Sequence, residues 1–94
     1  AHDITANRIA KKERTRFNPG PGPDINTFRR VIEVETKYTV HHGFRHLRGF
    51  RKPVYIAGAA PDATKKALKA ANGTTVGVMD HRGNVLRRST RRRA

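Results

Sequence analysis

The chain has 94 residues, of which 35% are hydrophobic and none is cysteine. This length indicates one small domain, and the lack of cysteine excludes a disulfide framework and a cysteine-based zinc site. Lysine and arginine number 21 against 7 aspartates and glutamates, so the net charge of +14 predicts a polyanionic partner. Nucleic acid fits that charge better than an anionic membrane does.

Three further expectations follow from composition. No apolar run approaches the ~20 residues of a membrane span, and the first residues do not have the pattern of a signal peptide. We therefore expect a cytoplasmic, intracellular protein. A domain of this size buries little apolar surface, so we also expect a second copy of the chain to form a homodimer.

The first helix is predicted over residues 4–14, with Asp3 as its N-cap. Glu13 ends its apolar stripe, four residues after Ile9. Its carboxylate lies either in water at the frayed helix end or close to other acidic residues. The outer surface of this helix carries basic residues that suit phosphates, namely Arg8, Lys11 and Lys12.

The segment 18–23 reads Asn-Pro-Gly-Pro-Gly-Pro, which excludes helix and predicts a tight loop that ends at Asp24. Residues 24–27 and 31–37 are predicted to be two strands of a hairpin. The hairpin brings Asp24 towards the acidic residues of the second strand.

The second strand carries two carboxylates where a strand needs none. Glu33, Glu35 and Lys37 alternate, so a strand places them on one face, with Glu33 and Glu35 about 6–7 Å apart. Asp24, Glu33 and Glu35 are three of the chain's 7 acidic residues and lie within a stretch of 12. Clustered carboxylates repel each other unless a divalent cation holds them, so this group is the candidate site.

The next helix is predicted over residues 40–50. His42 and His46 lie four residues apart on it, but no third ligand accompanies them, so we expect them to reach phosphates or lie at the surface. The helix and the residues after it carry a basic stripe suited to phosphates, formed by Arg45, Arg48, Arg51 and Lys52.

The second half of the chain alternates strand and helix. Strands are predicted at 54–57, 75–79 and 85–86, and a helix begins at Pro61 and ends near Asn72. The order is α-β-β-α-β-α-β-β, an α/β fold with a small mixed sheet flanked by helices. This gives a domain over 1–86 and a basic tail over 87–94, expected to be disordered without its partner; Arg87 and Arg88 begin the tail.

The predicted order of helices and strands and two short segments resemble the PD-(D/E)xK nuclease superfamily. The segments are Pro23-Asp24-Ile25 and Val31-Ile32-Glu33-Val34-Glu35. The likeness is nearest to archaeal Holliday-junction resolvases and related proteins of the restriction-endonuclease-like fold. By element order it covers about residues 4–80. It implies that Asp24, Glu33 and the carbonyl of Val34 bind Mg²⁺ or Mn²⁺. Glu13 loosely matches a glutamate that the family's first helix often supplies as a further ligand.

The third motif position departs from the family, because Glu35 stands where a lysine is usual. Glu35 could act as a second metal ligand or as a general base, and Lys37 could supply the missing ammonium. The overlapping Glu35-Thr36-Lys37 also matches the motif, although we prefer Glu33-x-Glu35 because the apolar strand leads into it.

The resemblance implies a metal-dependent endonuclease, with Asp24, Glu33, Glu35 and Lys37 as candidate catalytic residues. Its substrate would be DNA in preference to RNA, including structured or branched DNA. Two alternatives stay open: a non-catalytic basic nucleic-acid-binding protein, such as a ribosome-associated component, and an RNA-processing nuclease.

Overall fold

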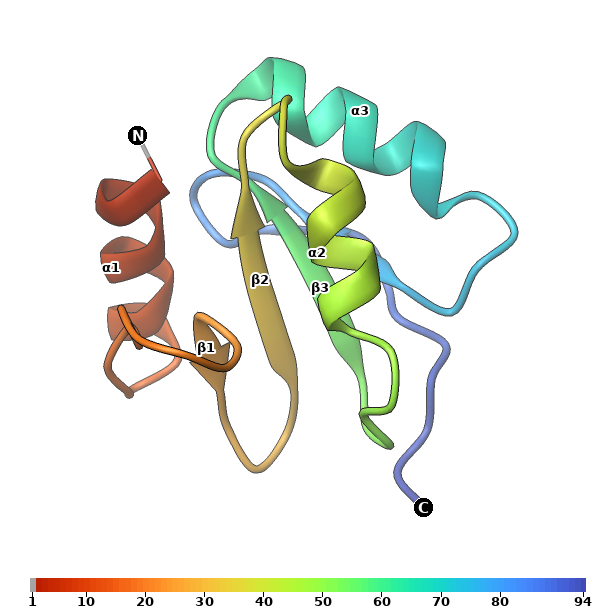
Figure 1. Cartoon of the computed structure of the whole chain (residues 1–94), viewed down its shortest axis with the longest axis horizontal. Coiled ribbons are helices and arrows are strands. Elements are labelled where there is room, and N and C mark those ends of the chain that lie inside the picture. The colour runs from red at the N-terminus through yellow and green to blue at the C-terminus, as the bar shows by residue number, and fades with distance from the viewer. Residues whose placement is uncertain (1) are drawn as a thin grey trace.

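The computed structural model describes residues 2–94, with elements in the predicted order α-β-β-α-β-α-β-β (Figure 1). None of the helices in this described stretch has the length and hydrophobicity that a membrane crossing requires. The elements are α1 His2–Lys12, β1 Ile25–Asn26, β2 Val31–Glu35, α2 Val40–His46, β3 Val54–Gly58, α3 Pro61–Ala71, β4 Gly77–Met79 and β5 Val85–Arg87.

The strands form one mixed sheet in the order β1-β2-β3-β4-β5. The β1–β2 pair is antiparallel and places Ile25 opposite Ile32. The β2–β3 and β3–β4 pairs are parallel, and the β4–β5 pair is antiparallel. The structure therefore confirms the predicted hairpin, the parallel crossovers and the mixed α/β sheet.

Helices cover both faces of the sheet, and β2 supplies core residues to each. Ile32 and Val34 pack with Ile9 of α1 in one apolar cluster. Val31, whose side chain points to the other face, packs with residues of α2 and α3 in a second cluster. All five residues of β2 are buried, the two glutamates included. The acidic pair thus lies almost wholly covered just beneath one face of the molecule.

Two elements end earlier than the sequence predicts. Strand β2 stops at Glu35 because Thr36 and Thr39 form a turn, in which the Thr36 N–H donates to Oγ1 of Thr39 at 2.9 Å. Helix α2 stops at His46, since the Arg48 N–H bonds to the Arg45 carbonyl three residues back and Gly49 follows with φ of 88°.

The basic segment 87–94 is fixed to the body, contrary to the expected disorder. Arg87 ends β5, and the Ser89 hydroxyl accepts the Val54 N–H and donates to the Thr75 carbonyl. The Arg91 guanidinium donates to the carbonyls of Leu47 and Phe50 just beyond α2. We expected a polyanion to order this segment, but backbone carbonyls of the protein itself accept its hydrogen bonds. A sequence pattern does not show which carbonyls will act as acceptors.

Candidate metal centre

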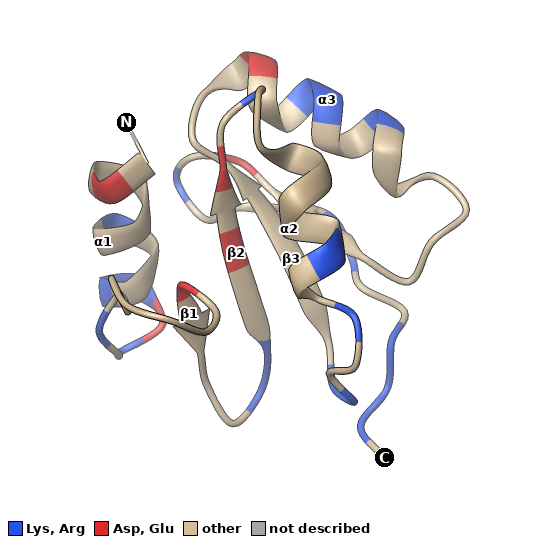
Figure 2. Ribbon diagram, viewed as in Figure 1, with Lys and Arg blue, Asp and Glu red and all other residues tan. Residues whose placement is uncertain are grey.

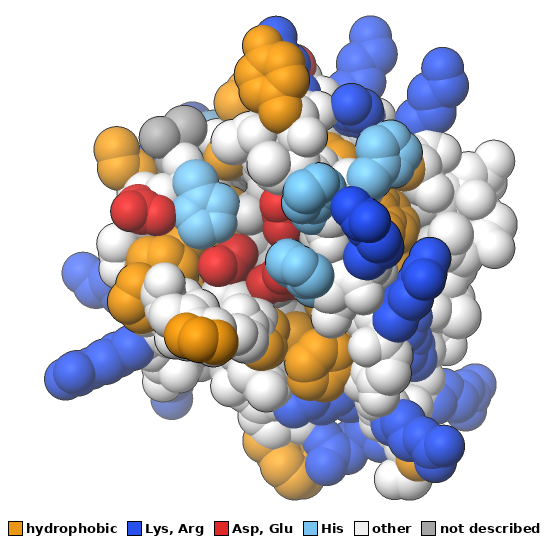
Figure 3. All heavy atoms as spheres, in the orientation of Figure 1, with side chains coloured by type: hydrophobic (Ala, Val, Ile, Leu, Met, Phe, Trp, Pro, Cys, Tyr) orange, Lys and Arg blue, Asp and Glu red, His pale blue; other side chains and the backbone are white. Residues whose placement is uncertain are grey.

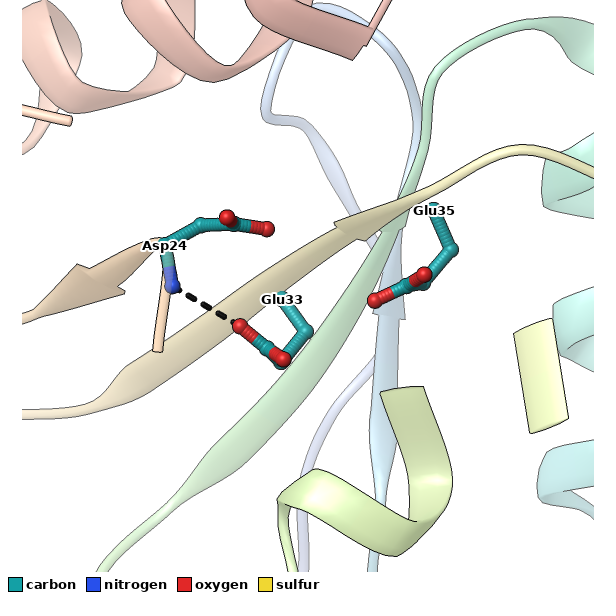
Figure 4. A group of neighbouring side chains, drawn as sticks. All are labelled: Asp24, Glu33 and Glu35. Carbon is teal, nitrogen blue, oxygen red and sulfur yellow. Dashed lines mark hydrogen bonds between the residues drawn. The ribbon is translucent and has the colours of Figure 1, made fainter. Parts of the chain in front are cut away.

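Three carboxylates meet at the centre of one face of the molecule (Figure 3). Asp24, Glu33 and Glu35 each offer an oxygen within 4.8 Å of the others. Figure 4 shows the side chains of Glu33 and Glu35 on the same face of β2, with Asp24 beside them on the segment that leads into β1. Glu33 is 3% exposed and Glu35 7%. The structure thus brings together the three acidic residues that the sequence predicts to share a site.

Asp24 is positioned by its loop and by backbone amides. The Asn18 side-chain amide donates to the carbonyls of Pro21 and Pro23, which folds the Pro-Gly run back on itself. The Asp24 N–H donates to Oε1 of Glu33, and Oδ2 of Asp24 accepts the Val34 N–H, each at 2.8 Å. This reciprocal pair of bonds fixes Asp24 against β2 without a lysine or arginine partner.

The carbonyl of Val34 lies on the same edge of β2 as Asp24. The N–H and C=O of one strand residue point to the same side, and the Val34 N–H points to Asp24. The Glu35 carbonyl points to the opposite side, where it accepts the Ala59 N–H. Strand β1 pairs with β2 only at Val31 and Ile32, so it does not occupy the Val34 carbonyl.

Gly43 of α2 lets the helix lie directly against Glu35. A Cβ atom at this position would come within 2.7 Å of Cγ and 2.9 Å of Oε2 of Glu35, and within 2.5 Å of Ile56. Sequence reasoning missed this residue. Its signal is a glycine inside a helix, where glycine costs about 1 kcal/mol relative to alanine and therefore indicates close packing.

Burial and mutual repulsion oppose ionisation of the two glutamates. Burial is the largest cause that raises the pKa of Glu35, to about 7; the Thr39 hydroxyl opposes the rise, and the charges of Glu33 and Asp24 add to it. Burial also raises the pKa of Glu33, against bonds from the Asp24 backbone and from His46. A bound cation would relieve both effects, because it favours the charged carboxylates.

Two histidines contact the carboxylates. His46 Nδ1 lies 2.9 Å from Oε2 of Glu33, and His2 Nε2 lies 3.2 Å from Oδ2 of Asp24. Burial lowers the pKa of His2, but the Asp3 and Asp24 carboxylates outweigh it and raise that pKa overall. The His46 side chain is 64% exposed, which agrees with its predicted surface position, and its contact with Glu33 adds a role that the sequence does not predict. The spacing of His42 and His46 was visible in the sequence, but the distance from His46 to Glu33 depends on how α2 packs.

Two predicted site residues lie elsewhere. Glu13 binds Arg30, with its Oε1 2.8 Å from Nε and its Oε2 2.5 Å from Nη2, so its carboxylate is not part of the centre. Lys37 follows the end of β2, and its ammonium lies 3.7 Å from the Asp62 carboxylate. The hypothesis that Lys37 shares a strand face with Glu33 is therefore wrong, because the turn that starts at Thr36 redirects it.

The basic residues surround the centre without neutralising it. In Figure 2, Lys and Arg segments are spread over the helices, the loops and the C-terminal run, and Figure 3 shows them around the rim of this face. Some of the residues predicted to bind nucleic acid donate to backbone carbonyls, namely Arg8, Lys12, Lys52 and Arg87. The others have exposed side chains, namely Lys11, Arg45, Arg48, Arg51 and Arg88.

The arrangement can hold a hard divalent cation. Within residues 2–94, no lysine or arginine forms an ion pair with Asp24, Glu33 or Glu35, although the chain has 21 such residues. Carboxylate oxygens are the ligands that Mg²⁺ and Mn²⁺ prefer. Compared with protein-family models, with curated proteins and with solved structures, the chain matches none.

Proposed function

We propose that the protein is a metal-dependent nuclease that hydrolyses phosphodiester bonds of DNA, including structured or branched DNA. One observation carries the proposal: three carboxylates, two of them buried, share a site to which a chain of net charge +14 brings no lysine or arginine among its described residues. Clustered, buried carboxylates are costly to ionise without a lysine or arginine partner, so their presence together favours a bound cation. The surplus of positive charge elsewhere favours a phosphate-rich substrate.

The donor set fits Mg²⁺ or Mn²⁺. Magnesium binds oxygens at about 2.0–2.1 Å, so oxygens on opposite sides of the ion lie about 4.2 Å apart. At most two of three ligands can lie opposite each other on one octahedral ion, and neighbouring ligand oxygens lie about 2.9 Å apart. The three carboxylate oxygens lie within 4.8 Å of one another, so the side chains would draw together by up to about 2 Å to hold one ion. We assign Asp24 and Glu33 as ligands, with the Val34 carbonyl available on the same edge.

Within this proposal, each residue has a separate task. The bound cation would lower the pKa of a water and offset the charge of the phosphate. Asp24 is held in place by the Val34 N–H, and Glu33 by the Asp24 N–H and His46. Glu35, whose carboxylate lies within 4.8 Å of both ligands, accepts the proton of the attacking water. Lys37 has no such task, because its ammonium pairs with Asp62.

As part of this proposal, the protein is similar to PD-(D/E)xK nucleases and has their restriction-endonuclease-like fold. The order of elements and the position of Asp24 beside Glu33 agree with it. The proposal also includes a homodimer, since cleavage of both strands of a duplex requires two sites.

A second candidate is a basic nucleic-acid-binding protein, such as a ribosome-associated component, in which the carboxylates hold a structural ion. The pairing of Lys37 with Asp62 favours it, because the site then lacks the ammonium that this nuclease family usually has.

Cleavage assays separate the two candidates. Labelled linear, branched and single-stranded DNA, and RNA of the same sequences, are incubated with Mg²⁺ or Mn²⁺. We expect cleavage by the wild type, and loss of cleavage in Asp24→Asn and Glu33→Gln with folding retained. Asp62→Asn is the matched control, since it makes the same substitution at an exposed carboxylate. No cleavage of any substrate with either metal rules out the nuclease, and cleavage that persists in both variants rules out the assigned site.

A further inference from the structure

A polar cavity lies at the far end of α1 from the carboxylates. Its volume is about 830 Å³, and it lies between the end of α1, the β1–β2 turn and the start of β3. His2, the first residue of α1, contacts Asp24, whereas Lys12 and Arg14 at the other end line the cavity. A helix of 11 residues spans about 15 Å. The cavity is therefore separate from the candidate metal centre.

The charge of the cavity is positive and only partly compensated. Lys12, Arg14, Arg29 and Arg30 line it, and Glu13 is its one carboxylate, which leaves a surplus of three positive charges. Glu13 is engaged with Arg30, whose guanidinium also lies 5.4 Å from the centre of the Tyr55 ring. This pair is a fixed wall of the cavity. Lys12, Arg14 and Arg29 supply the charge that remains.

Arg14 occupies a backbone position that favours glycine. Its φ is 59°, and among residues 2–94 no other residue apart from glycine has a positive φ. The N–H groups of Arg14 and Thr15 donate to the Lys11 and Ala10 carbonyls, which is the helix-ending motif that usually carries glycine at this position. An arginine here costs free energy that glycine would not. Strain of this kind is typical of functional positions.

An exposed aromatic side chain lies beside the basic residues. Phe28 is 78% exposed at the β1–β2 turn and lines the same cavity. The Arg93 guanidinium lies 3.9 Å from the centre of its ring, and Arg93 also donates to the Phe28 carbonyl. Basic groups with an adjacent aromatic ring form the usual combination for a nucleic-acid strand, with phosphate on the cations and a base on the ring.

We infer that this cavity binds a backbone phosphate of a nucleic-acid strand, with Arg14 and Arg29 on the phosphate and Phe28 under the neighbouring base. The site needs no metal ion. The inference rests on the proposed function only for the class of partner. It places a second contact on the strand about one helix length from the carboxylates, which would fix where the strand enters the centre.

Binding measured in EDTA tests the inference apart from catalysis. Fluorescence anisotropy of a labelled single-stranded oligonucleotide is followed against salt concentration for the wild type and Arg14→Gly. Glycine suits the backbone at this position, so the variant should unfold at the same or a higher temperature than the wild type. Lys69→Ala is the control, because it removes one positive charge from an exposed position on α3.

We expect Arg14→Gly to weaken binding about tenfold at low salt and to lower the slope of log affinity against log salt concentration by about 0.7. Lys69→Ala should change the affinity less than twofold. Arg29→Ala and Phe28→Ala should each weaken binding as well. Equal effects of Arg14→Gly and Lys69→Ala would overturn the inference. So would binding of inorganic phosphate or a free nucleotide as tight as that of the oligonucleotide.

The outcome is independent of the candidate metal centre. Binding in EDTA needs no metal ion, so the wild type should bind the oligonucleotide there whether or not it cleaves DNA with metal. If only the nuclease proposal fails, the wild type will cleave no DNA with metal but will still bind the oligonucleotide in EDTA, and Arg14→Gly will still weaken that binding. Failure of the cavity alone would appear as normal metal-dependent cleavage with no specific effect of Arg14→Gly.

Discussion

Replacement of Glu35 by glutamine should stabilise the metal-free protein at alkaline pH. Glu35 is 7% exposed and has a pKa of about 7, against an ordinary value of 4.5. The folded protein therefore holds this proton more tightly than the unfolded chain does. Stability from the protonated carboxyl is fully present below pH 4.5 and is lost as the pH rises through about 7.

The size of the effect follows from the two pKa values. At about 1.4 kcal/mol per pKa unit, the difference between 4.5 and about 7 corresponds to about 3 kcal/mol of lost stability above pH 7. Glutamine has no charge to bury, and its amide can donate to the oxygens of Glu33 and Asp24 within 4.8 Å. For a domain of this size, about 3 kcal/mol raises the unfolding temperature by about 10–25 °C.

Urea unfolding at pH 4, 6 and 8 in EDTA measures this difference directly. We expect Glu35→Gln to match the wild type at pH 4, to exceed it by about 2 kcal/mol at pH 6, and to exceed it by about 3 kcal/mol at pH 8. Asp62→Asn, at an exposed carboxylate, should show little change with pH. A variant no more stable than the wild type at pH 8, or equally stabilised at pH 4 and pH 8, would refute the reasoning. Saturating Mn²⁺ should stabilise the wild type and reduce the advantage of the variant.

Three further predictions concern the surroundings of the site. Gly43→Ala should lower the free energy of unfolding by about 1–3 kcal/mol in urea titrations, because its Cβ would meet Ile56 at 2.5 Å and Glu35 at 2.7 Å; unchanged stability would show that α2 moves freely. Arg30→Met should cost about 1–2 kcal/mol by the same measurement, since it leaves the Glu13 carboxylate, 10% exposed, without its partner; a neutral result would mean that water replaces the guanidinium. Mn²⁺ affinity measured by calorimetry should fall as the pH drops below about 7, because a protonated Glu35 no longer adds negative charge beside the ligands Asp24 and Glu33. An affinity that is the same at pH 8 and at pH 5 would show that metal binding is not coupled to the protonation of Glu35.

Local signals in the sequence predict the element order and the three carboxylates. The proline and glycine residues before Asp24 restrict the chain to a loop, and Pro61 begins α3 as expected. The alternation along β2 places Glu33 and Glu35 on one face. Strand β1 has only two residues, but its antiparallel pairing with β2 brings Asp24 to Glu33. The hairpin can be predicted from about a dozen consecutive residues, so local sequence is enough to predict that these carboxylates meet.

The rest depends on contacts between segments far apart in the chain. The sequence allowed two positions for the Glu13 carboxylate, in water at the helix end or close to the other acidic residues. It binds Arg30 instead, 17 residues further on, and no local pattern predicts that contact. His46 reaches Glu33 only because α2 crosses the face of β2 that carries the glutamates, and Gly43 permits that approach. Arg91 donates to backbone carbonyls 41 and 44 residues away, so charge alone wrongly indicated a disordered tail.

Isothermal titration of the protein with Mn²⁺ at pH 8 tests most directly whether Asp24 and Glu33 hold a divalent cation. We predict one ion per chain for the wild type and for Asp62→Asn. Asp24→Asn and Glu33→Gln, confirmed as folded by circular dichroism, should lose this binding. Absence of binding in the wild type, or the same affinity in all four proteins, would contradict the assignment of the carboxylates as a metal centre.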